Sequence, residues 1–212
     1  MQIGNCGLCL KKCELRKSHL IPKALYRKLR NSHEGNDLVL IQGHNKTSKY
    51  TDYQIAEYFL CGECEDRFSR FGERKIIPDC YASKNEFPAL QWAKSCSKYV
   101  DIQEERWINP YINSFANTEF YLYYAASMVW RSSAWPKTES SDKYSLGKKY
   151  QELFRRYLLG VDNFPSNVYV AVYIDTDEDP NTMILILLTR SGFLRMNMRL
   201  RNHKQMRVST DT

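Results

Sequence analysis

The stretches Cys6-Gly-Leu-Cys9 and Cys61-Gly-Glu-Cys64 repeat one pattern in the 212-residue chain: two cysteines separated by two other residues. Two such pairs supply four thiolates, which is the ligand set of a closed, tetrahedral structural zinc site. The total of seven cysteines is odd and fits a complete disulfide framework poorly. We therefore predict a structural Zn²⁺ bound by Cys6, Cys9, Cys61 and Cys64, whose binding energy contributes directly to folding.

Two alternatives for the cysteines stay open at the level of sequence. In the first, Cys13 replaces Cys9 as a ligand. In the second, the four paired cysteines bind no metal. Cys80 and Cys96 are isolated in the chain, and we expect both to be packing residues.

The cellular compartment bears on the state of these thiols. The N-terminal residues lack the apolar core of a signal peptide, and no run approaches the roughly 20 apolar residues that span a bilayer. We expect a cytoplasmic protein with no membrane partner, in which the thiols stay reduced.

The segments around the two cysteine pairs predict a small zinc fold. Residues 1–15 are predicted as a knuckle loop, residues 22–30 as a helix that begins at Pro22, and Asp37–Ile41 as a strand. The second pair lies between a strand and a helix that continues from Glu65 to Phe71. Knuckle, hairpin, second knuckle and helix is the order of a treble-clef zinc finger, which we predict for residues 1–80.

The remainder of the chain, residues 81–212, is predicted to form a second domain of helices followed by a small antiparallel sheet. The predicted helices cover Glu86–Val100, Asn117–Trp130 and Leu146–Leu159, and the predicted strands cover Val168–Ile174, Met183–Thr189 and Phe193–Leu200. Short links between the strands favour antiparallel pairing. The second helix is apolar on all sides, so we expect it to be buried with Trp130 in the core. The predicted fold class is α+β.

The net charge of +7 is concentrated near the two ends of the chain. Residues 1–30 contain eight basic residues and one acidic residue, and residues 190–207 contain six basic residues and no acid. Such a distribution favours a surface that binds DNA or another polyanion, with two simply solvated basic ends as the alternative. The predicted nucleic-acid contacts are Lys23, Arg27, Lys28, Arg195, Arg199 and Arg201.

The element Ser18-His-Leu-Ile-Pro22 lies between the two cysteine pairs. With a histidine in this element, between two such pairs, the sequence resembles the HNH family of His–metal finger endonucleases over about residues 4–72. The resemblance implies that His19 is the general base for the water that attacks a phosphodiester. It also implies one Mg²⁺ or Mn²⁺ ion that stabilises charge on the leaving 3′ oxygen.

Two positions depart from the family pattern. The residue before the histidine, often an Asp or His ligand, is Ser18, and the histidine that commonly follows the second pair is Glu65. A carboxylate suits Mg²⁺ or Mn²⁺, so we predict that Glu65 keeps the ligand role; a plain helix-dipole role is the alternative. The middle Asn of the motif has no clear match, Asn45 being the nearest, and His33 and His44 are weaker candidates for the same site.

The leading functional prediction is an HNH-like, metal-dependent endonuclease that hydrolyses phosphodiester bonds in DNA, of the kind associated with phage defence or mobile elements. A non-catalytic, zinc-stabilised protein that binds nucleic acid or a partner is the main alternative. A third hypothesis is a subunit whose nuclease activity requires an activating protein partner.

Overall fold

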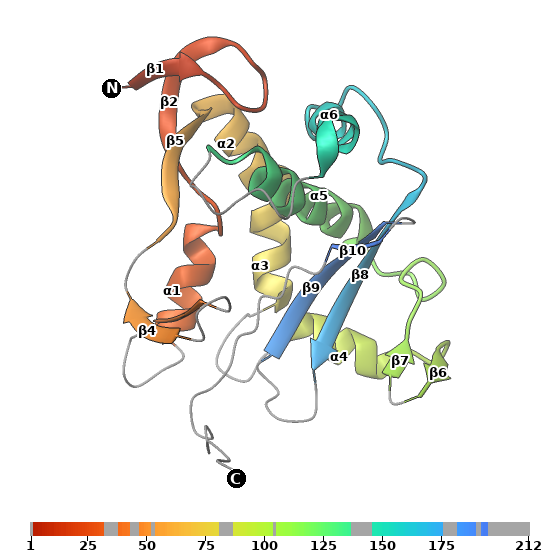
Figure 1. Ribbon diagram of the computed structural model, residues 1–212. Coiled ribbons are helices and arrows are strands. Elements are labelled where there is room, and N and C mark those ends of the chain that lie inside the picture. The colour runs from red at the N-terminus through yellow and green to blue at the C-terminus, as the bar shows by residue number, and fades with distance from the viewer. Residues whose placement is uncertain are drawn as a thin grey trace.

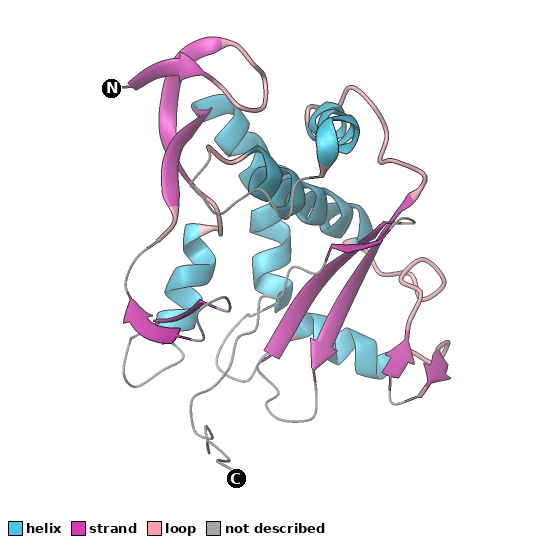
Figure 2. Ribbon diagram, viewed as in Figure 1, coloured by secondary structure: helices cyan, strands magenta, loops and turns pink. Residues whose placement is uncertain are grey.

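A computed structural model of the chain describes residues 2–31, 38–42, 47–51, 54–80, 87–103, 105–136, 146–175, 182–189 and 192–194. These residues form a mixed arrangement of α-helices and small antiparallel sheets (Figure 2). Within the described ranges, none of the helices combines the length and the apolar character that crossing a membrane would require.

The two cysteine pairs are held by a three-stranded antiparallel sheet in the order β1-β2-β5. Its strands are β1 (Gln2–Asn5), β2 (Lys12–His19) and β5 (Ala56–Cys61). Residues 1–15, predicted as a loop, thus form most of a β-hairpin whose turn carries the first cysteine pair. A bulge between Arg16 and Lys17 puts Leu15 and Ser18 on the same buried side, although they are three residues apart.

The rest of the N-terminal module, a name used here for residues 1–80, contains a further hairpin and several helical segments. They are α1 (Lys23–Asn31), β3 (Leu38–Gln42), β4 (Thr47–Thr51), α2 (Gly62–Phe68), the π-helical segment η1 (Ser69–Glu73) and α3 (Arg74–Cys80). Strands β3 and β4 pair antiparallel. Helix α1 begins next to Pro22, as predicted, whereas the helical run after Cys61 continues to Cys80 instead of ending at Phe71.

The second half of the chain is arranged around one long helix (Figure 1). Its elements are α4 (Pro88–Ser95), β6 (Val100–Ile102), β7 (Glu105–Trp107), α5 (Thr118–Ala134), α6 (Gly147–Leu158), β8 (Val168–Asp175), β9 (Thr182–Thr189) and β10 (Gly192–Leu194). The last three strands form a sheet in the order β10-β9-β8, and both pairings are antiparallel, as predicted. The C-terminal part of the predicted strand Phe193–Leu200 lies outside the described residues.

A single cluster of buried side chains joins the two halves, with α5 at its centre. The cluster extends from Cys6 in the first knuckle to Val168 in β8. Trp130 of α5 is 1% exposed and stacks on Phe59 of β5, with the ring centroids 5.6 Å apart. The prediction of a buried helix with Trp130 in the core is confirmed. The core crosses the predicted domain boundary at residue 80, and the division into two domains stays a prediction.

Candidate metal centre and the surroundings of His19

The two cysteine pairs converge on one point. The sulfur atoms of Cys6, Cys9, Cys61 and Cys64 all lie within 4.8 Å of one another, and all of these residues except the half-buried Cys9 are buried. The Sγ atoms of Cys9 and Cys61 are 3.9 Å apart. Bonds of about 2.3 Å in a tetrahedral Zn–S₄ site place neighbouring sulfurs about 3.8 Å apart. The cluster can therefore hold a metal ion such as Zn²⁺.

Backbone hydrogen bonds shape the first knuckle. The Gly7 N–H donates to the Phe59 carbonyl at 2.9 Å, which ties the knuckle to β5. Leu10 takes a left-handed conformation with φ of 64°, and its N–H donates to the Cys6 carbonyl at 2.9 Å. Cys13 is not part of the sulfur cluster, and its thiol donates to the Lys11 carbonyl at 3.2 Å. The arrangement favours Cys9 over Cys13 as the fourth ligand.

The cluster stabilises a thiolate at Cys6. A hydrogen bond from the Cys64 thiol, together with backbone N–H groups that include that of Cys61 at 3.3 Å, lowers the pKa of Cys6 to about 4. The pKa of Cys64 is raised because its thiol donates to Cys6 and because it is buried. Burial raises the pKa of Cys9 as well. A thiolate is the form of cysteine that binds metal, so Cys6 is the cluster residue already favoured in its metal-binding form.

His19 is the last residue of β2, is half-buried, and lies near three positively charged side chains. Burial lowers the pKa of its imidazole, and the charges of Lys23, Lys17 and Arg131 lower it further, against a hydrogen bond with Gln54 that raises it. The imidazole is therefore neutral at neutral pH and able to accept a proton. The exposed Lys17 and Lys23 make its surroundings favourable for a phosphate group.

Ser18 and Glu65, the two positions that depart from the HNH pattern, contact each other. The Ser18 side chain is buried and accepts a hydrogen bond from the Leu60 N–H at 3.1 Å. Burial raises the pKa of Glu65, whereas its hydrogen bond with Ser18 and the charge of Arg131 lower it. One carboxylate oxygen of Glu65, Oε1, is buried without a hydrogen-bond partner. A bound cation would give this oxygen a partner.

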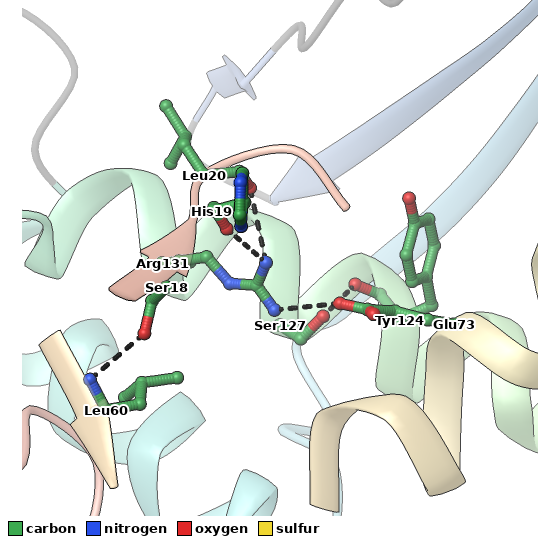
Figure 3. Close-up of polar contacts among 8 residues, drawn as sticks. All are labelled: Ser18, His19, Leu20, Leu60, Glu73, Tyr124, Ser127 and Arg131. Carbon is green, nitrogen blue, oxygen red and sulfur yellow. Dashed lines mark hydrogen bonds and ion pairs between the residues drawn. The ribbon is translucent and has the colours of Figure 1, made fainter. Parts of the chain in front are cut away.

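Arg131, which directly follows the predicted helix Asn117–Trp130, contacts both the end of β2 and η1 (Figure 3). Its guanidinium donates to the His19 carbonyl at 2.7 Å and to the Glu73 carboxylate at 3.1 Å. The guanidinium carbon also lies 4.8 Å from the centre of the Phe68 ring. Arg131 is 112 residues from His19 in sequence, so no local pattern could have identified the contact.

Among the described residues around this point, Glu65 is the one side chain in a position to bind a divalent cation. Over the part of the chain that the structure describes, the four-cysteine cluster is the only group of three or more His, Cys, Asp or Glu with its ligand atoms this close together. Glu65 Oε1 is a free carboxylate oxygen, but Ser18 is already engaged and the Arg131 charge lies nearby. A second metal at this point would need water or phosphate oxygens to complete its coordination.

The predicted nucleic-acid contacts stay predictions, and two of them have described side chains. Lys23 and Arg27 lie on α1 with exposed side chains. The Lys28 side chain and the other predicted or candidate residues lie outside the described part of the chain: His33, His44, Asn45, Arg195, Arg199 and Arg201.

No protein-family model matches the sequence, and no match is found among curated proteins or solved structures. The resemblance to HNH endonucleases is therefore carried by the two cysteine pairs and by the Ser18–Pro22 element alone.

Proposed function

We propose that this chain is an HNH-like nuclease in which a zinc-bound treble clef presents His19 to a phosphodiester bond of DNA. The observation that carries the proposal is the environment of His19. A half-buried, neutral imidazole lies among the positive charges of Lys17, Lys23 and Arg131, which suits a general base acting beside a phosphate.

The order of elements supports a treble clef in the N-terminal module. The first cysteine pair lies in the β1–β2 turn, the β3–β4 hairpin follows, and the second pair joins β5 to α2. A Zn²⁺ ion in the cluster would fix the end of β2 relative to the first turn of α2. These two segments carry His19 and Glu65.

The exposed amines of Lys17 and Lys23 would bind the phosphate, and the His19 imidazole would take a proton from water as its oxygen attacks phosphorus. The bond between phosphorus and the 3′ oxygen breaks, and the 3′ oxygen leaves with the electron pair. A Mg²⁺ or Mn²⁺ ion held by Glu65 Oε1 would stabilise the charge on that leaving oxygen.

A zinc-stabilised nucleic-acid-binding protein without catalysis is the second candidate. The arrangement around Glu65 favours this candidate. The Ser18 hydroxyl accepts a hydrogen bond from the Leu60 N–H, and Arg131 places a positive charge near the Glu65 carboxylate, so the carboxylate has less need of a metal ion. In this case Lys17 and Lys23 would bind phosphates, and His19 would contribute no chemistry.

Plasmid cleavage separates the two candidates. Wild-type protein is incubated with plasmid in Mg²⁺ or Mn²⁺ beside His19→Ala, and the zinc content of both is measured. A nuclease should lose about 10²- to 10⁴-fold in rate on removal of its general base, with zinc unchanged. Wild-type protein that cleaves nothing but binds DNA with a steep salt dependence would refute a nuclease that acts by itself and favour the second candidate.

Two further variants refine the roles of the site residues. Glu65→Ala should raise the concentration of Mg²⁺ needed for half-maximal cleavage if Glu65 is a metal ligand, and leave it unchanged if Glu65 only favours the helix dipole. Lys23→Ala should weaken DNA binding and reduce the salt slope by about 1, because one phosphate contact is lost.

A further inference from the structure

Helix α5 reaches the end of β2 through one side chain. Arg131, which is 1% exposed, donates through one guanidinium nitrogen to the carbonyls of His19 and Leu20, at 2.7 and 3.3 Å. Its other terminal nitrogen donates to Glu73 at 3.1 Å (Figure 3). The side chain thus connects α5 with both β2 and η1.

We propose that Arg131 is a positioning residue, through which α5 fixes His19, so that both halves of the chain build the His19 site. The N-terminal module supplies the imidazole, and the second half of the chain supplies the group that holds it. The proposal goes beyond the proposed function and rests on it only in treating His19 as the reacting residue.

The geometry explains why an arginine is needed at this position. Its planar guanidinium presents donors in fixed directions, so it can serve the two carbonyls and the Glu73 carboxylate at the same time. His19 is the last residue of β2, and Leu20 follows as the chain turns toward α1. Carbonyls at a strand end need partners from outside the sheet, and Arg131 supplies them.

Packing holds the guanidinium in place. It lies against the Phe68 ring of α2, at 4.8 Å, and the opposing Glu73 side chain is only 21% exposed. A charge buried with its partner has little freedom to move, because either group alone would lose its solvation without compensation. The position of the His19 backbone is therefore tied to α5, α2 and η1 together.

Arg131 also adds one of the three positive charges that surround the His19 imidazole. The others are Lys17 on β2 and Lys23 on α1, both with exposed side chains, and Gln54 contributes a hydrogen bond. A variant that removes the Arg131 charge should therefore alter the titration of His19. Because loss of the charge alone would also alter that titration, the carbonyl ¹³C shifts of His19 and Leu20, which report the two Arg131 hydrogen bonds, are measured beside it.

The test compares Arg131→Met, Arg131→Lys and Arg155→Met in the full-length, zinc-loaded chain. Arg155 is a matched control, because it donates to the Leu8 carbonyl of the N-terminal module at 2.9 Å and pairs with Glu152 at 2.7 Å, without appearing among the groups that shift the pKa of His19. The readout is the midpoint of the His19 imidazole resonance in an NMR pH titration, assigned with His19→Ala.

We expect Arg131→Met to raise the His19 midpoint, since one nearby positive charge is lost. Arg131→Lys should restore most of the wild-type value, and Arg155→Met should leave it unchanged. An unchanged midpoint in zinc-loaded, folded Arg131→Met, or an equal change in Arg155→Met, would overturn the proposal.

If Arg131→Met yields no folded protein, a milder variant replaces it. Arg131→Gln removes the charge but keeps a side-chain amide that can donate to the His19 carbonyl, so the His19 midpoint should rise above that of the wild type. An unchanged midpoint in this variant would contradict the proposal. These midpoints do not depend on cleavage, so a wild-type protein that cleaves no DNA would refute the proposed function and leave the positioning role standing.

Discussion

Replacing Gly7 by alanine tests whether the first knuckle and the core form one packed unit. A Cβ atom at residue 7 would lie 2.1, 2.6 and 2.8 Å from three carbons of the Phe59 ring, where about 3.5 Å is normal contact. The ring cannot move aside, because its centroid lies 5.6 Å from that of Trp130 and 5.3 Å from that of Trp135. We expect a loss of about 3 kcal/mol, the upper end of the range for overpacked cores.

The second knuckle provides the matched control. Gly62 holds the same position between its two cysteines, but a Cβ there would first meet the end of the flexible Arg16 side chain, at 3.2 Å. Gly62 is also the first residue of α2, where alanine is favoured over glycine. We expect Gly62→Ala to change stability by less than about 0.5 kcal/mol.

Urea denaturation of the zinc-loaded variants measures the difference, and competition with a chromogenic chelator measures zinc affinity. Because about 1.4 kcal/mol is a factor of ten, Gly7→Ala should weaken apparent zinc binding by roughly 100-fold, since binding and folding are coupled. Equal stability losses in the two variants would refute the claim that Gly7 is required by its close approach to Phe59.

Two further predictions concern reactivity and pH. Iodoacetamide should modify the half-buried Cys13 of the metal-loaded protein and not Cys80, whose thiol pKa is raised by burial. Chelation should make the four cluster thiols reactive, and Cys80 with them because it lies in the same core. Mass spectrometry that finds Cys80 alkylated in the metal-loaded protein would contradict this. If DNA is cleaved, the rate should fall at low pH as His19 becomes protonated, with a midpoint below the usual histidine value of about 6.5, because burial and neighbouring cations lower the His19 pKa. A midpoint well above pH 6.5 would exclude His19 as the base.

Features with local signals were predictable from the sequence. The spacing of the cysteine pairs identified the four sulfurs that converge, and Pro22 marked the start of α1. The apolar run at residues 117–130 correctly indicated a buried helix, because a helix that is apolar on all sides has no face to offer solvent. The short links between the last strands correctly indicated antiparallel pairing.

The contacts that define the surroundings of His19 had no such signal. The β1–β2 hairpin escaped prediction because its strands are mostly exposed, and the bulge after Arg16 breaks the alternation that marks a strand. The π-helical segment that places Glu73 opposite Arg131 has no sequence signature known to us. The Arg131 contact joins residues more than a hundred positions apart, and only the tertiary fold brings them together.

The distance along the chain between the two cysteine pairs has a consequence for synthesis. Cys9 and Cys61 are 52 residues apart. At bacterial or eukaryotic translation rates of about 5–20 residues per second, the first pair waits roughly 3–10 s for the second to emerge. During that interval Cys6, Cys9 and Cys13 can react with a metal ion or an oxidant without the second pair. Cellular yield of correctly assembled protein should therefore depend on zinc supply and redox balance while the chain is still on the ribosome.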